Sequence, residues 1–175
     1  ARLICLLQAF DHKDLKLAES MLPKARKNID SISGGDGNQV RRINAVMQII
    51  DGSMIEDTKP AMALEHFKLA LKDLEGVHQA LPDHIAIRSR ISHYALKSAT
   101  IAESLDLFDD AAKLRSEAAG HLRSILKKNP ELKLAKIDLA KIEILSAESD
   151  MRAGNDTQGA AKLKVAEALL AGLST

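Results

Sequence analysis

Apolar residues recur along the chain in an order that predicts a helical repeat. In each occurrence an alanine is followed by branched aliphatic residues four and seven positions later. These offsets place the three side chains on one stripe of an α-helix, so each occurrence predicts an amphipathic helix. The leading residues are Ala25, Ala70, Ala118 and Ala166, and one heptad before them stand Ala18, Ala63, Ala111 and Gly159. Because small residues let helices approach closely, we expect a second helix to pack against each of these stripes.

Helix-breaking and helix-capping residues set the expected ends of the striped helices. The first three of these helices are expected to end before Gly34-Gly35, Pro82 and Pro130. Cap-type residues precede each helix, so the starts are expected at Asp11 or Asp14, at Asp57 or Thr58 with Pro60 just inside, at Asp109, and at Asp156 or Thr157.

The segments between the striped helices are apolar on more than one side. Their helices are expected at 1–9, 39–54, 84–106 and 131–152. In the last of them, one stripe contains Leu132, Ala135, Leu139 and Ile142, and a second contains Leu134, Ile137, Ile144 and Leu145. A helix that is apolar on two faces is expected between two neighbours, as is the inner helix of a stacked array.

These elements predict an all-α fold, a right-handed α-α superhelix (solenoid) of about four antiparallel helical hairpins. The repeats span about 1–38, 39–83, 84–130 and 131–175, and they are expected to form a single helical-repeat domain. The first helix is short and the chain opens with Ala1 rather than Met. We therefore expect this domain to be an excised fragment of a longer protein.

Composition and charge agree with this fold and exclude several classes of function. The 175 residues include 26 Ala and 25 Leu but only three Phe, one Tyr and no Trp, which is typical of helical rather than sheet proteins. Twenty-five basic and 24 acidic residues are interspersed, so nucleic-acid binding is not expected. No apolar run approaches the roughly 18 residues of a membrane span. We expect no membrane insertion, and a cytoplasmic location by default.

The striped helices resemble the second helix of tetratricopeptide repeats. That family's order of an alanine, two later apolar residues and a closing proline occurs here as Ala118, Leu122, Ile125 and Pro130, and again as Ala70, Leu74, Val77 and Pro82. The resemblance implies a helix–turn–helix solenoid that binds proteins. The repeat here is 45 to 48 residues, longer than that family's ~34, and the first-helix aromatic and Leu-Gly pair are missing. This period also fits HEAT-type repeats.

Residues that could support catalysis or metal binding do not form a recognisable motif. The six histidines include no pair at the spacing with which one helix presents two metal ligands. The single cysteine, Cys5, cannot form an internal disulfide and is expected to be inert core. Acidic pairs such as Asp109-Asp110 precede helices, where they stabilise the helix dipole. We expect no catalytic residue, no metal and no cofactor, and the segment is not expected to be an enzyme.

The function that this fold favours is a protein–protein interaction scaffold or a regulatory or sensory module. A stack of hairpins presents a concave surface lined by the first helices, whose polar residues would contact a protein or peptide. The candidate contact residues are Asn44, Gln48, Arg90, His93 and Lys97. One alternative is a helical-repeat segment of a larger bacterial signalling protein, such as a serine/threonine kinase or a transcriptional regulator. A second is a small-ligand-binding or enzymatic helical bundle, and self-association through exposed repeat ends is a further possibility.

Overall fold

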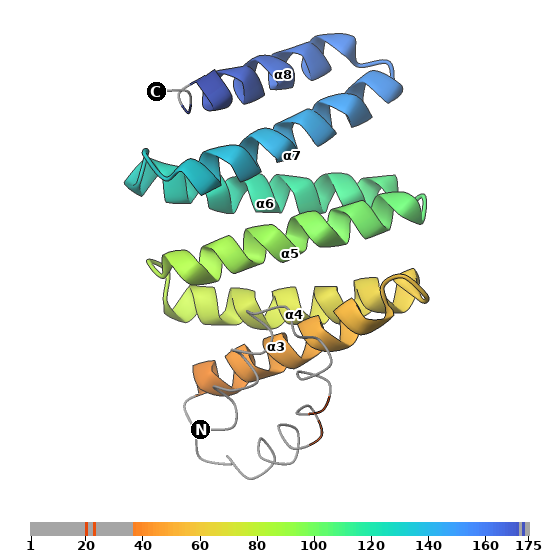
Figure 1. The fold of residues 1–175 in the computed structure, drawn as a ribbon, viewed down its shortest axis with the longest axis vertical. Helices are drawn as coiled ribbons and strands as arrows, with labels where there is room; N and C mark the ends of the chain where they lie inside the picture. The colour runs from red at the N-terminus through yellow and green to blue at the C-terminus, as the bar shows by residue number, and fades with distance from the viewer. Residues whose placement is uncertain (1–19, 21–22, 24–36, 172, 174–175) are drawn as a thin grey trace. The chain divides into compact units, whose positions relative to one another are not determined.

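The part of the chain that the structure describes is built from α-helices (Figure 1). The computed structural model describes residues 20, 23, 37–171 and 173. Within 37–171 the helices are α3 (Gly37–Ile55), α4 (Pro60–Ala80), α5 (Ile85–Ser104), α6 (Phe108–Lys128), α7 (Lys133–Arg152) and α8 (Asp156–Ala171). No strand occurs among the described residues, which confirms the all-α prediction.

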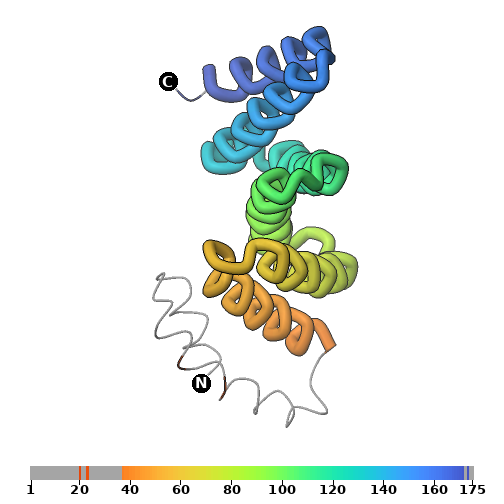
Figure 2. Tube along the Cα trace, turned by 90° about the vertical axis from the view of Figure 1, so that its right-hand side faces the viewer, coloured from red at the N-terminus to blue at the C-terminus, as the bar shows by residue number. Residues whose placement is uncertain are grey.

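Consecutive helices pack in pairs joined by short loops. α3 packs on α4, α5 on α6 and α7 on α8, and α6 also packs against α7 (Figure 2). Because each loop is only a few residues long, the two helices of a pair run antiparallel and form a hairpin. The hairpin expected within residues 1–38, with Ala18, Ala25 and Cys5, lies almost wholly outside the described residues. The handedness of the predicted superhelix stays a prediction.

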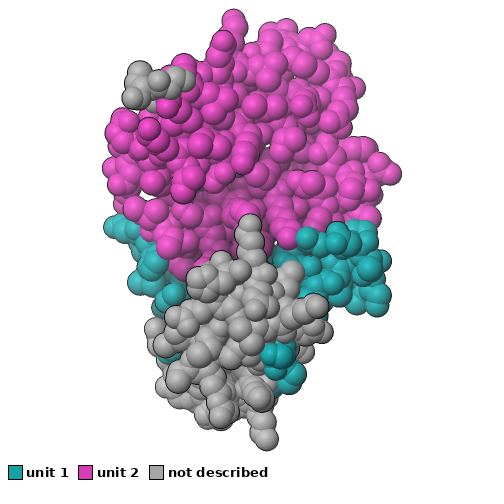
Figure 3. Space-filling model, in the orientation of Figure 1, with its two compact units in different colours: residues 1–84 teal, residues 85–175 magenta. Residues whose placement is uncertain are grey.

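The chain divides into two compact units, residues 1–84 and 85–175 (Figure 3). The described helices of the first unit are α3 and α4, and the second unit contains α5 to α8. The boundary falls within one residue of the predicted border between the second and third repeats. The single-domain organisation stays a prediction.

The helices recur with the period expected from the sequence. The first helices begin at Gly37, Ile85 and Lys133, and the second helices begin at Pro60, Phe108 and Asp156, in both cases at intervals of 48 residues. The predicted ranges 39–54, 84–106 and 131–152 agree with α3, α5 and α7 to within two residues at each end. Gly37 and Asn38, expected in a connecting loop, instead form the first turn of α3.

The alanine stripe lies in the core of the hairpins. Ala63, Ala70, Ala111 and Ala118 have no exposed surface. Gly159 occupies the matching place in α8, where a Cβ would stand 3.0 Å from the Ala147 carbonyl oxygen of α7. The small residues of the stripe are therefore points at which paired helices come close, as the pattern predicts.

One expectation about burial is met only in part. α7 packs against both α6 and α8, as expected of a helix that is apolar on two faces, but on its second stripe Leu134 is 71% exposed and Ile137, Ile144 and Leu145 are only half-buried. On the first stripe, Ala135, Leu139 and Ile142 lie in the core, whereas Leu132 is half-buried. An apolar stripe in the sequence of α7 is therefore buried only in part.

The expected N-caps are also wrong in two helices. The N-cap residues of α4 and α6 are Lys59 and Leu107, and neither makes a side-chain capping hydrogen bond. Thr58 Oγ1 instead donates to the Ile55 carbonyl at the end of α3, 3.3 Å away. Asp109 lies in the first turn of α6, where its charge still favours the helix dipole. Pro60 begins α4 as predicted.

Two hairpin loops share one helix-ending motif. After α5, the Asp106 N–H donates to the Glu103 carbonyl and the Leu107 N–H to the Ala102 carbonyl, with Asp106 at φ 59°. After α7 the same two bonds recur around Gly154 at φ 81°. This is the Schellman arrangement, which satisfies the last helical carbonyls through one left-handed residue. The motif ends α5 and α7 with backbone hydrogen bonds where the chain turns into the second helix of each hairpin.

Candidate functional site

Three of the predicted contact residues share one face of α5. Arg90, His93 and Lys97 are three and four residues apart, so they follow one another along the same side of the helix. His93 is exposed, and Arg90 and Lys97 are half-buried. The His93 ring meets the ring of buried Tyr94 edge-on, with centroids 4.9 Å apart. The structure therefore presents a basic and aromatic strip on the second unit.

The other two predicted contact residues lie on α3, in the first unit. Asn44 and Gln48 are half-buried and one helical turn apart. The Gln48 side-chain oxygen lies 2.7 Å from His66 Nδ1 on α4, so His66 donates to it when that nitrogen carries the proton. Part of the Gln48 side chain is thus engaged within the hairpin, and Asn44 is the more available of the pair.

A polar pocket that the sequence analysis missed lies among α6, α7 and α8. Its volume is about 150 Å³. The lining residues are Ala112, Arg115, Ser116, Ala119, Arg123, Ile142, Glu143, Ser146, Ser149, Asp150 and Lys162. Eight of these eleven side chains carry a charge or a hydroxyl, which distinguishes the pocket from the apolar core around it.

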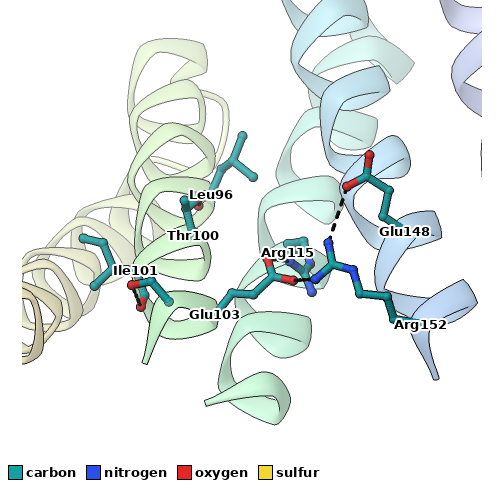
Figure 4. Close-up of polar contacts among 8 residues, drawn as sticks. Leu96, Thr100, Ile101, Glu103, Arg115, Glu148 and Arg152 are labelled. Carbon is teal, nitrogen blue, oxygen red and sulfur yellow. Dashed lines mark hydrogen bonds and ion pairs between the residues drawn. The ribbon is translucent and has the colours of Figure 1, made fainter. Parts of the chain in front are cut away.

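Arg115 is the most deeply buried charge of this pocket, with 2% of its surface exposed. Its Nη1 donates to Glu103 Oε2 on α5 at 2.9 Å. The other oxygen of Glu103 accepts from Arg152 Nη1 on α7 at 3.1 Å, and Glu148 lies 3.7 Å from Arg152 Nη2 (Figure 4). The Glu103 carboxylate therefore accepts hydrogen bonds from two guanidinium groups, which belong to two different helices. The Nε and Nη2 atoms of Arg115 are buried and have no hydrogen-bond partner among the described residues.

Two further ion pairs border the pocket. Arg123 of α6 donates to Glu143 of α7, whose side chain is 5% exposed. Lys162 Nζ of α8 lies 2.6 Å from Asp150 Oδ2 of α7. Counting Arg115, the lining holds three cationic side chains and two carboxylates. The third cation, Arg115, is paired with Glu103, which lies outside the lining.

Alignment of the repeats at 48-residue intervals distinguishes the buried charges Arg115 and Glu143 from the residues at the equivalent positions. Position 115 lies 48 residues after Phe67, which is fully buried, and 48 residues before Leu163. Glu143 lies 48 residues after Ala95, which is 1% exposed. Polar side chains thus occupy positions that are apolar in the neighbouring repeats. A search for charged residues at otherwise apolar repeat positions finds both Arg115 and Glu143.

An apolar groove lies between the two helices of the last hairpin. It is open to solvent, has a volume of about 460 Å³, and is lined by Ile144, Leu163, Ala166, Glu167, Leu170 and Ala171. Leu163 and Leu170 are each 39% exposed. This groove is one exposed apolar surface, among the described residues, through which the expected self-association could occur.

The described residues contain neither a metal-type cluster nor a membrane-spanning helix. No group of three His, Cys, Asp or Glu residues could hold a metal ion in the part of the chain that the structure describes. None of the described helices is both long and apolar enough to cross a bilayer. Cys5 lies outside the described residues.

Comparison with protein-family models, curated proteins and solved structures finds no match to this chain.

Proposed function

We propose that the chain is a protein- or peptide-binding module built from helical hairpins. The observation that carries the proposal is the strip of Arg90, His93 and Lys97 along one face of α5. Two cations and an exposed ring on one rigid helix form a surface that suits an acidic segment with an aromatic or apolar residue. Such a scaffold role accords with the tetratricopeptide-like order of the second helices, and we place the module in a cytoplasmic signalling protein.

The proposal is tested by selecting peptides from a random displayed library on the full chain. Because the strip is basic, we expect the selected peptides to be enriched in Asp and Glu. Reversing both charges, Arg90→Glu with Lys97→Glu, should weaken binding of the selected peptides by about tenfold or more. The melting temperature should change by no more than about 2 °C, because substitutions at partly exposed positions have small effects on stability.

A matched pair on another helix controls for the change in net charge. Lys113→Glu with Lys127→Glu reverses two exposed cations of α6 and should leave peptide affinity within about twofold. Equal losses in both double variants would show a non-specific electrostatic effect and contradict the proposal. A selection that yields no acidic peptides would contradict it as well.

A further inference from the structure

The pocket of α6 to α8 contains one edge of a guanidinium group with unused hydrogen-bond donors. Nη1 of Arg115 is engaged by Glu103, whereas Nε and Nη2 have no partner among the described residues. Nη2 is the terminal nitrogen on the same side as the Nε–H, so the two groups direct parallel N–H bonds from one edge of the guanidinium plane. Two parallel donors at this spacing match the two oxygens of a carboxylate.

Leaving this edge without acceptors is energetically unfavourable. A buried donor that loses its hydrogen bonds to water and gains none in the protein destabilises the fold, more so when the group is charged. Arg115 is 2% exposed, so bulk water does not solvate the group. Because Arg115 lines the pocket, an acceptor that enters the pocket is placed to satisfy it.

The charge and size of the pocket limit what that acceptor can be. Arg123 and Lys162 are matched by Glu143 and Asp150, and Arg115 is paired through Nη1 with Glu103, which lies outside the lining. The charges around the pocket are therefore nearly balanced, and a singly charged group is repelled by the two carboxylates of the lining less than a doubly charged phosphate is. A volume of about 150 Å³ is below that of typical drug-sized sites, about 300 Å³ or more, and suits a small group.

Hydroxyl groups complete the lining. Ser116 of α6 and Ser146 and Ser149 of α7 border the pocket, and their hydroxyls can donate to an anion. Ser116 is exposed, as is Ala112 beside it in the lining, so this part of α6 lies at the solvent side of the pocket. The pocket therefore combines a route from solvent with donors inside.

We propose that this pocket binds a carboxylate group, whose two oxygens accept hydrogen bonds from Nε and Nη2 of Arg115. The carboxylate belongs either to a free small organic acid or to an acidic side chain of a bound peptide. The site goes beyond the proposed peptide-binding function, because it is formed by α6, α7 and α8 and uses none of the residues of the α5 strip. Failure of either proposal leaves the other intact.

Titration of the full chain with sodium acetate tests the site directly. The readout is the ¹H–¹⁵N resonance of the Arg115 Nε–H group, identified by its loss in Arg115→Lys. We expect a saturable shift with a dissociation constant on the order of millimolar, as for a single charged bidentate contact. Sodium chloride at equal ionic strength should not produce it. An Arg115 resonance that acetate leaves unmoved would show that ordered water satisfies the group, and would overturn the proposal.

Variants and other probes separate the remaining outcomes. Ala112→Leu narrows the solvent side of the pocket at an exposed helical position and should weaken acetate binding about tenfold, even if Arg115→Lys fails to fold. Acetate binding that Ala112→Leu leaves unchanged would argue against the pocket. A shift with inorganic phosphate but not with acetate would overturn the carboxylate assignment.

Two more probes identify the source of the carboxylate. A blocked aspartate tripeptide and its asparagine counterpart are titrated in the same way. A shift of the Arg115 resonance with the aspartate peptide alone supports the pocket as a site for an acidic side chain. Acetate binding without peptide binding supports it as a site for a free organic acid.

Discussion

Arg115 is a charged residue at a repeat position that is apolar in the neighbouring repeats. The equivalent positions are Phe67 and Leu163, so the helical repeat does not itself require a charged side chain there. A buried ion pair is weak evidence for stability, since its desolvation penalty can exceed the Coulombic gain. The network of Arg115, Glu103 and Arg152 instead ties three helices together and leaves donors facing a pocket. A binding role explains this arrangement better than a stabilising one.

The carboxyl group of Asp73 on α4 makes the free energy of unfolding depend on pH. Burial raises its pKa above the ordinary value of 3.8, and the charges of Arg41 and Lys72 oppose that rise. The folded chain therefore keeps this proton at a pH at which the unfolded chain has released it. The contribution of Asp73 to stability is complete below pH 3.8 and is lost as the pH rises through the folded-state pKa.

Replacing Asp73 by Asn tests this sign. The variant should be more stable than the wild type at pH 7, by less than about 1 kcal/mol because the group is partly exposed, and the difference should vanish below pH 3.8. Urea unfolding across this pH range provides the measurement. Asp57→Asn, at an exposed position in the loop before α4, controls for the change from acid to amide. An advantage of Asp73→Asn that grows as the pH falls would contradict the sign.

At the scale of elements, the two helical glycines Gly52 and Gly120 differ in how closely a neighbouring helix packs against them. Gly52 of α3 is buried, and a Cβ there would lie 3.0 Å from Phe67 Cε1 and 3.2 Å from the Ala63 carbonyl oxygen. Gly120 of α6 is exposed, and a Cβ there would meet nothing within 4 Å. Both glycines lie inside helices, so they differ in packing rather than in secondary structure.

The same substitution should therefore have opposite effects at the two positions. Gly120→Ala should stabilise the chain by about 0.5–1 kcal/mol, because alanine loses less backbone entropy in a helix. Gly52→Ala gains the same helix propensity but must displace the Phe67 ring, and overpacking of about 1–3 kcal/mol should make it net destabilising. Urea unfolding midpoints of the two variants give the comparison. Equal stabilisation by both would show that α3 and α4 do not pack closely at Gly52.

Element positions were predictable because a strong local signal repeats. The stripe at Ala63, Ala70, Ala111 and Ala118 and the breakers Pro82 and Pro130 define the helices to within two residues. The N-caps were not predictable from residue type, because Lys59 and Leu107 occupy the N-cap positions of α4 and α6 without a side-chain hydrogen bond, and Asp109 lies inside the first turn of α6. The exposure of Leu134 depends on which helices are present beside α7, which periodicity alone does not reveal.

At the scale of the whole molecule, the five predicted contact residues and the pocket show where sequence reasoning stops. Arg90, His93 and Lys97 share one face because their spacing is local to α5, and their role as contact residues stays a prediction. The pocket joins residues of α6, α7 and α8 that are up to 50 positions apart, and no single helix contains its motif. Its donors are unpaired only because of how three helices pack. Such a site becomes visible once the tertiary contacts are known.

The division of the chain at residue 84 leads to a prediction for the second unit. Residues 85–175 form two hairpins joined by the packing of α6 against α7, with buried Arg115 and Glu143 paired to Glu103 and Arg123. A unit of this size, with its own core and internal ion pairs, is large enough to fold alone. Expressed by itself, it should have a helical circular-dichroism spectrum and a single cooperative thermal transition. A broad transition without cooperativity would show that the unit needs the preceding residues 1–84, as expected of one continuous repeat array whose stability comes from contacts between neighbours.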